Sequence, residues 1–175
     1  ADGNETVQAW KVALTHRQGP TALILSRQKL PLLPETLSLC AEGLPRGAYI
    51  LRDSPTPALD VLLIASGSEV PLALRAQEEL GRQGIGARVV SMPSWELFET
   101  QPRAYREAVL PASAARRLAI EAGSSMGWAR YAGAQGATVT IDSRFGASAP
   151  ADVLARELGF TVEHVVEEAR RLLSC

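Results

Sequence analysis

Hydrophobic positions are arranged most clearly over residues 60–92, where they predict a strand, a helix and a second strand in succession. Residues 61–65 (VLLIA) form a continuous apolar run, which is typical of a strand that helices cover on both faces. Residues 71–83 follow with apolar positions on one helix face and charged positions on the other. Gly84 ends this helix before the strand expected at 87–91. The stretch therefore predicts a β-α-β unit and a parallel sheet.

The amino-terminal part of the chain shows a helix pattern, a strand pattern and then a loss of periodicity. Asp2 or Asn4 is expected to cap a helix that runs to about His16, and residues 21–26 (TALILS) are expected to form a buried strand. Residues 31–57 contain five prolines and little periodicity, so most of this stretch is interpreted as a linker. One helix and one strand cannot make a domain, so we expect them to be the end of a domain whose body lies upstream.

The carboxyl-terminal half continues the alternation of strands and helices. Its last helix carries valine, alanine and leucine on one face and charged residues on the other, which is typical of a helix that covers a sheet. The pattern thus predicts an α/β fold. The further expected strands are 48–51, 117–121 and 137–142, and the further expected helices are 95–101, 105–110, 128–131, 150–158 and 161–173.

Composition and charge exclude several classes of protein. The chain has 18 basic and 19 acidic side chains, mixed along its length, so neither nucleic acid nor an anionic membrane is an expected partner. No apolar run approaches the roughly 20 residues that cross a bilayer. Cys40 and Cys175 are far apart, which argues against a disulfide framework and favours a reducing, cytoplasmic location. Because the first residue is Ala1 rather than Met, a processed or excised fragment is expected.

Motifs of the common catalytic and nucleotide-binding classes are missing from the sequence. His16 and His164 are the two histidines, and neither has a ligand-type neighbour at metal-site spacing, so both are interpreted as structural. Gly67 and the glycines at 123–127 fit neither the dinucleotide nor the P-loop spacing. Ser68 does not lie in the Gly-x-Ser-x-Gly turn of a serine hydrolase.

Polar residues follow two of the expected strands directly. Residues 66–69 (SGSE) come after one strand, and Glu121, Gly123 and Ser124 come after another. Ligands of open α/β sheets bind outside the carboxyl ends of strands, so these residues are candidates for lining a crevice. The alternative is that they cap helices and permit tight turns.

Arg27 follows the strand expected at 21–26. A guanidinium group at the end of a strand is well suited to hold a phosphate with two parallel hydrogen bonds. The alternative interpretation is a solvated arginine in a loop, and the residues by themselves leave both open.

Several segments together resemble a known family. They are ALILSRQKLP at 22–31, then IASGSEVPLAL, ARVVSMPSWELFETQ, YREAVLP, AIEAG and FGASAPADVLARELGFTVEHVV. In this order they resemble the carboxyl-terminal part of transketolase, and the resemblance covers essentially the whole chain. The LSRQ and FGxSAP segments favour transketolase over deoxyxylulose-phosphate synthase and the beta-type subunits of 2-oxoacid dehydrogenases.

The resemblance implies an activity and its cofactors. Transketolase transfers a two-carbon ketol group from a ketose phosphate to an aldose phosphate in the pentose phosphate pathway. It acts as a homodimer with thiamine diphosphate and a divalent cation, magnesium or calcium. The family's metal ligands, cofactor glutamate and sugar-polarising histidines lie upstream of this chain. The resemblance therefore implies no catalytic, cofactor-binding or metal-binding residue here, and the chain alone is expected to be inactive. Arg27 matches the arginine that grips the substrate phosphate.

The resemblance also implies a division into domains. Residues 1–34 would be the tail of the pyrimidine-binding domain, 35–47 a linker, and 48–175 the C-terminal domain. That domain is expected to have three layers, α/β/α, around a mostly parallel mixed sheet of about five strands, preceded by the helix and strand of residues 1–34. A different class of function stays open, in which the chain is a non-catalytic binding or assembly module with a small ligand at 66–69 and 121–124.

Overall fold

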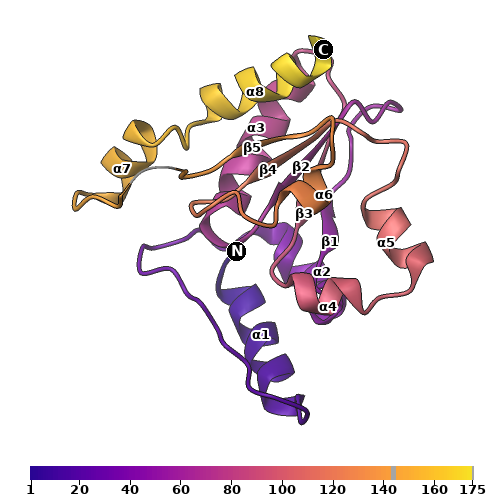
Figure 1. Cartoon of the computed structure of the whole chain (residues 1–175), viewed down its shortest axis with the longest axis vertical. Coiled ribbons are helices and arrows are strands. Elements are labelled where there is room, and N and C mark those ends of the chain that lie inside the picture. Colours follow the sequence, from indigo (N-terminus) through magenta and orange to yellow (C-terminus); the bar gives the residue numbers. More distant parts are fainter. Residues whose placement is uncertain (143–144, 175) are drawn as a thin grey trace.

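A five-stranded mixed sheet forms the centre of the fold (Figure 1), as given by a computed structural model that describes residues 1–142 and 145–174. The strands are β1 (Tyr49–Arg52), β2 (Val61–Ala65), β3 (Ala87–Ser91), β4 (Arg117–Ile120) and β5 (Ala137–Val139), in the spatial order β1-β3-β2-β4-β5. The edge strand β1 runs antiparallel to β3, and the other neighbours are parallel. This arrangement confirms the expected α/β class and the mostly parallel mixed sheet.

Helices cover both faces of the sheet, because successive side chains of a strand point to opposite faces. Every residue of β2 is buried. Leu63 packs into a cluster with α3 and α8, which lie side by side on one face, whereas Leu62 and Ile64 pack into a second cluster with α4, α5 and α6. The helices of this unit are α3 (Val70–Arg82), α4 (Trp95–Glu99), α5 (Arg103–Val109), α6 (Ala129–Ala132), α7 (Ala151–Glu157) and α8 (Val162–Ser174). From residue 48 onward, each expected element is present with its ends shifted by a few residues at most.

The amino-terminal helix was predicted correctly, but the strand after it was not. Helix α1 (Gly3–Thr15) begins after Asp2, whose side chain accepts a hydrogen bond from the N–H of Glu5. Residues 21–26 form no strand, and Ile24 is 97% exposed. A strand requires a neighbour for its backbone groups, and this apolar run has none within the described residues. The strand prediction at 21–26 is therefore wrong for this structure.

The stretch expected to be a linker contains a packed helix. Helix α2 (Pro34–Gly43) and a short 3-10 helix, η1 (Leu44–Arg46), lead into β1. Pro34 lies in the first turn of α2, where a missing N–H is tolerated, so this proline starts a helix instead of preventing one. Thr36 and Cys40 are buried. The interpretation of this stretch as irregular is wrong, whereas the domain boundaries stay a prediction.

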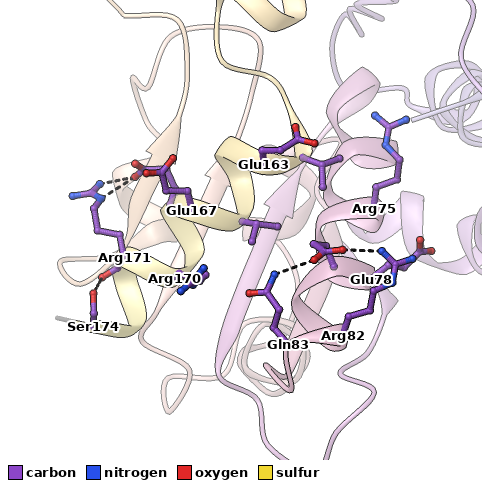
Figure 2. A pocket seen from close by; sticks show the side chains of 13 residues that line it. Arg75, Glu78, Arg82, Gln83, Glu163, Glu167, Arg170, Arg171 and Ser174 are labelled. Carbon is purple, nitrogen blue, oxygen red and sulfur yellow. Dashed lines mark hydrogen bonds and ion pairs between the residues drawn. The ribbon is translucent and has the colours of Figure 1, made fainter.

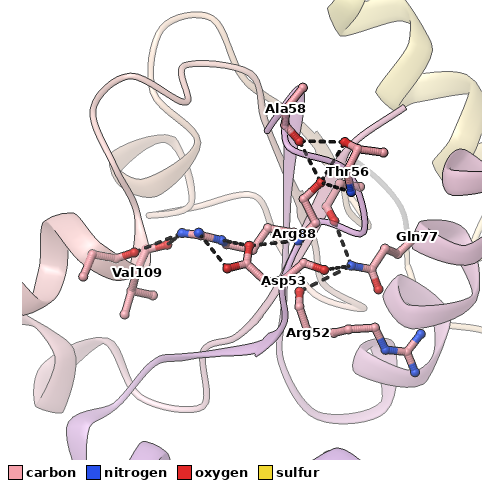
Figure 3. A network of polar contacts seen from close by, with 10 residues as sticks. Arg52, Asp53, Thr56, Ala58, Gln77, Arg88 and Val109 are labelled. Carbon is pink, nitrogen blue, oxygen red and sulfur yellow. Dashed lines mark hydrogen bonds and ion pairs between the residues drawn. The ribbon is translucent and has the colours of Figure 1, made fainter. Parts of the chain in front are cut away.

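A polar network fixes the connection between β1 and β2 at the end of the sheet opposite the carboxyl ends of the parallel strands (Figure 3). The buried Gln77 of α3 donates from Nε2 to the carbonyl oxygens of Arg52, Asp53 and Ala87, at 3.3, 2.9 and 2.7 Å. Arg88 holds the Asp53 carboxylate with two hydrogen bonds of 2.8 and 3.1 Å. One amide side chain thus links α3, β3 and the start of the connection.

Candidate functional site

The loops after β2 and β4 meet at the point where the connections of the sheet diverge. The chain leaves β2 through α3 toward β3, whereas it leaves β4 through α6 toward β5 on the other side. Parallel sheets leave a crevice outside the carboxyl ends of two such strands, and ligands of α/β proteins bind there. The prediction that residues 66–69 and 121–124 line one crevice rests on this rule. Of these residues, Ser66, Glu121, Gly123 and Ser124 line a hollow at that point.

Hydrogen bonds join the polar side chains of this crevice. The Ser66 hydroxyl donates to Oε2 of Glu121 at 2.6 Å, so the ends of β2 and β4 are linked directly. The Ser68 hydroxyl donates to Oε1 of Glu69 at 2.7 Å. The 66–69 segment forms the 3-10 turn η2 (Gly67–Glu69), in which Glu69 is 8% exposed. Ser66 and Ser68 are therefore partners of a half-buried carboxyl group, that of Glu121, and a buried one, that of Glu69. Neither of these two serines caps a helix with its side chain.

A hollow of about 310 Å³ opens beside these residues. Trp95 and Trp128 form one wall, with ring centroids 5.0 Å apart and planes at 87°. Neither tryptophan was predicted to line the crevice, because residues 95–101 and 128–131 were expected only as connecting helices. Aromatic residues just after a strand of a parallel sheet are the signal that could have found them. The lining comprises Ser66, Met92, Pro93, Ser94, Trp95, Glu96, Glu121, Gly123, Ser124 and Trp128.

The carboxyl groups of Glu69 and Glu121 hold their protons more tightly than ordinary glutamates. Burial and the neighbouring Glu121 carboxylate raise the pKa of Glu69, against the lowering effect of the Ser68 hydrogen bond. Burial also raises the pKa of Glu121, although the Ser66 hydroxyl opposes it. Ionising both carboxyl groups therefore costs the folded state free energy.

We expect Glu69→Gln to change the pH dependence of stability in a defined direction. The folded-state pKa of Glu69 lies above its usual value of 4.5, so the folded state binds this proton more tightly than the unfolded state. The free energy of unfolding therefore falls as pH rises from below 4.5 through the raised pKa. The glutamine variant lacks this loss, so its stability relative to the wild type should increase with pH. Urea unfolding of both proteins across this range measures the difference, and the exposed Glu163→Gln is the control. A flat or falling difference would contradict the prediction.

A second, larger hollow of about 1130 Å³ lies between α3 and α8 (Figure 2). Its walls carry acidic and basic side chains together, and several of them pair with each other. Arg82 pairs with Glu79 at 2.7 Å, and Arg171 pairs with Glu168 at 2.5 Å. Five glutamates and four arginines line this groove, so its charges nearly balance, and we interpret it as a solvated groove between two covering helices.

Arg27 lies on an exposed bend between α1 and α2 and lines neither hollow. Within the described residues, no hydrogen bond or ion pair involves its side chain. Arg17, on the same connection, is exposed as well. The structure therefore leaves the Arg27 guanidinium open to a ligand, and it tests neither the phosphate-binding role nor the alternative of a solvated loop residue.

The metal-binding residue types are dispersed in the described part of the chain. Residues 1–142 and 145–174 contain no group of three or more His, Cys, Asp or Glu that could hold a metal ion. Cys40 is buried and free, and Cys175 lies outside the described residues. None of the helices in those same ranges is long and apolar enough to cross a membrane.

Comparison with known proteins identifies the family. Residues 47–161 match the model of the transketolase-like C-terminal domain. A transketolase of Halalkalibacterium halodurans is 56% identical over 173 residues, which is 99% of this chain and 26% of that protein. The chain belongs to the transketolase family. A Geobacillus stearothermophilus transketolase is 51% identical over the same share of both chains.

Solved structures of transketolases have the same fold. A transketolase from Leishmania mexicana superimposes with a TM-score of 0.90 at 44% identity, over 99% of this chain and 24% of that chain. A Pichia stipitis transketolase, described as a complex with sedoheptulose-7-phosphate, gives a TM-score of 0.89 at 36% identity over the same shares. The chain thus spans about a quarter of the length of the transketolases that it matches.

Proposed function

We propose that this chain is the carboxyl-terminal portion of an enzyme that transfers a two-carbon ketol group from a ketose phosphate to an aldose phosphate. The observation that carries the proposal is the 56% identity to a transketolase over 99% of the chain. A transketolase of closely similar fold was solved with sedoheptulose-7-phosphate, a sugar phosphate of the expected class. The proposal includes action in the pentose phosphate pathway, a homodimer of the full-length protein and a cytoplasmic location.

The cofactors belong to the upstream part of the proposed enzyme. When bound there, thiamine diphosphate would supply carbanion-stabilising chemistry for the group transfer, and a divalent cation, magnesium or calcium, would be needed with it. The described residues of this chain offer no set of donors that fits such a cation. We therefore propose that this chain is inactive alone.

The contribution that we propose for this chain is a grip on the substrate phosphate by Arg27. Among the described residues, eight arginines are held in ion pairs, at positions 52, 82, 88, 103, 106, 130, 156 and 171. Arg27 has no such partner within the described residues, so its five N–H donors are free for a ligand. A bidentate contact between guanidinium and phosphate is favoured by both charge and geometry.

We expect Arg27→Ala in the full-length enzyme to weaken the use of phosphorylated acceptors selectively. A phosphate far from the reacting carbonyl is held about equally in the ground state and the transition state, so KM should rise more than kcat falls. Loss of a charge-assisted contact is worth roughly 1.5–3 kcal/mol, on the order of tenfold to a hundredfold in kcat/KM. Arg27→Lys should recover part of the loss, because an ammonium group cannot form the fork.

The measurement is kcat and KM for one phosphorylated and one unphosphorylated acceptor. Arg17→Ala is the matched control, because Arg17 is an exposed arginine on the same connection. Equal losses on both acceptors would assign Arg27 to the fold instead of the phosphate. No change on either acceptor would restore the interpretation as a solvated loop residue.

A further inference from the structure

The connection that carries Arg27 is held at its two ends. Residues 17–32 form no helix or strand, and nearly all of them are exposed. Among the described residues, no hydrogen bond or ion pair involves any of residues 17–32. The course of this connection therefore depends on how its flanking helices, α1 and α2, are placed.

One buried carboxylate joins the beginnings of both flanking helices. Asp2 is 4% exposed, and its Oδ1 accepts from the N–H of Glu5 at 3.1 Å, in the first turn of α1. Its Oδ2 accepts from the N–H of Leu33 at 2.8 Å and from the hydroxyl of Thr36 at 2.6 Å, at the start of α2. Burial by itself would raise the pKa of Asp2, but these hydrogen bonds lower it below its usual value. The ionised side chain therefore holds the start of α1 against the start of α2.

A second buried carboxylate fixes α1 to the sheet. Glu5 is 2% exposed, and its Oε1 accepts from the hydroxyl of Tyr49 in β1 and from the hydroxyl of Ser91 in β3, both at 2.6 Å. Its Oε2 lies against the nitrogen of Ala1. Glu5 therefore fixes α1 against β1 and β3, the two strands at one edge of the sheet.

We propose that Asp2 and Glu5 are positioning residues for Arg27. Asp2 holds the end of the connection at Leu33 directly. The end after Thr15 is held through the length of α1, whose start Asp2 and Glu5 fix against α2 and the sheet, so these contacts set where the guanidinium meets the substrate phosphate. The inference rests on the proposed phosphate-binding function of Arg27. Binding groups act efficiently when their supports fix them in the productive geometry, and an error of about 1 Å can cost on the order of a hundredfold in rate.

Asp2→Asn in the full-length enzyme tests the proposal. An asparagine has one acceptor oxygen in place of two, so it can hold the start of α1 or the start of α2 but not both. KM for a phosphorylated acceptor should rise on the order of tenfold, while kcat and the KM for an unphosphorylated acceptor stay within about twofold. In an Arg27→Ala background, Asp2→Asn should have no further effect on the ratio of the two acceptors.

Two other variants separate positioning from general loss of stability. Asp60→Asn is the matched control, because Asp60 also accepts a backbone N–H, that of Gly86 at 2.7 Å, at the amino end of β2. It should leave the acceptor ratio unchanged. Ser91→Ala removes one of the two hydroxyl donors to Glu5 and should shift the ratio in the same direction as Asp2→Asn, by a smaller factor. Ser91→Ala alone decides the matter if Asp2→Asn does not fold.

The outcomes distinguish the inference from the function on which it rests. The inference is overturned if Asp2→Asn and Ser91→Ala change both acceptors equally, leave the ratio unchanged, or keep their effect in the Arg27→Ala background. If Arg27→Ala itself does not change the ratio, the phosphate-binding function fails, and the positioning role fails with it. If Arg27→Ala weakens the use of the phosphorylated acceptor selectively but Asp2→Asn and Ser91→Ala do not, Arg27 still binds the phosphate. Only the positioning role is then excluded.

Discussion

Gly47→Ala should destabilise the chain by about 3–5 kcal/mol, through backbone strain and direct overlap. Gly47 follows η1 with a φ of 83°, in the left-handed region that favours glycine. A Cβ atom there would lie 2.2 Å from the nitrogen of Phe98 and 2.3 Å from the carbonyl oxygen of Ser94. These are backbone atoms at the start of α4, and the Ser94 N–H also donates to the Gly47 carbonyl at 3.0 Å. Neither side can move without displacing the helix.

Gly84→Ala is the control that separates strain from overlap. Gly84 has a φ of 76°, but a Cβ atom there would meet no heavy atom within 4 Å. We expect this variant to lose roughly 1–2 kcal/mol, the cost of the left-handed conformation alone. Urea unfolding of both variants measures the two losses. Equal losses would show that η1 and α4 can separate at little cost.

Gln77→Glu should cost the fold about 3–5 kcal/mol at neutral pH. The substitution replaces the Nε2 donor with an oxygen that faces the carbonyl oxygens of Arg52, Asp53 and Ala87 (Figure 3). Gln77 is 2% exposed, so a carboxylate at this position would lose its hydration. The three carbonyl groups would offer it no hydrogen-bond donor in return.

The loss in Gln77→Glu should also depend on pH. The folded state would favour the protonated carboxyl, which can donate one hydrogen bond, so the deficit should shrink as pH falls toward the usual carboxyl range. Gln18→Glu makes the same chemical change at an exposed position and should stay within about 0.5 kcal/mol of the wild type. Unfolding curves at two pH values test both statements, and a pH-independent loss would argue that packing, not charge, is responsible.

Local patterns predicted the sheet and its covering helices because each of those elements buries its apolar face within this chain. The continuous run at 61–65 and the amphipathic pattern of α8 are of this kind. Residues 21–26 have an equally strong apolar pattern, but a pattern does not state whether its partner strand is present. Helix α2 was not predicted because the prolines of this stretch were taken as helix breakers. Pro34 lies in the first turn of α2, where a proline is tolerated.

The candidate site was predicted less completely than the fold. The rule on strand ends located Ser66 and Glu121, because it depends only on strand order and direction. The tryptophan wall of the crevice depends on where α4 and α6 pack, which the sequence does not state. Arg27 was a candidate on two grounds, its place after the strand expected at 21–26 and the family resemblance. The first ground fails because residues 21–26 form no strand, so the resemblance alone supports Arg27. Asp2 was predicted as a helix cap, but its second partner, α2, was read as a linker.

The contacts of Glu5 bear on how parts of related enzymes can be exchanged. The match to the transketolase-like C-terminal domain begins at residue 47. The hydroxyls of Tyr49 and Ser91 nevertheless donate to Glu5, which lies well before that residue. A hybrid of two transketolases joined at residue 47 would take the acceptor from one parent and the donors from the other. A junction ahead of Asp2 would inherit the whole arrangement from a single parent. A unit that keeps these contacts within one parent therefore includes α1 as well as the sheet.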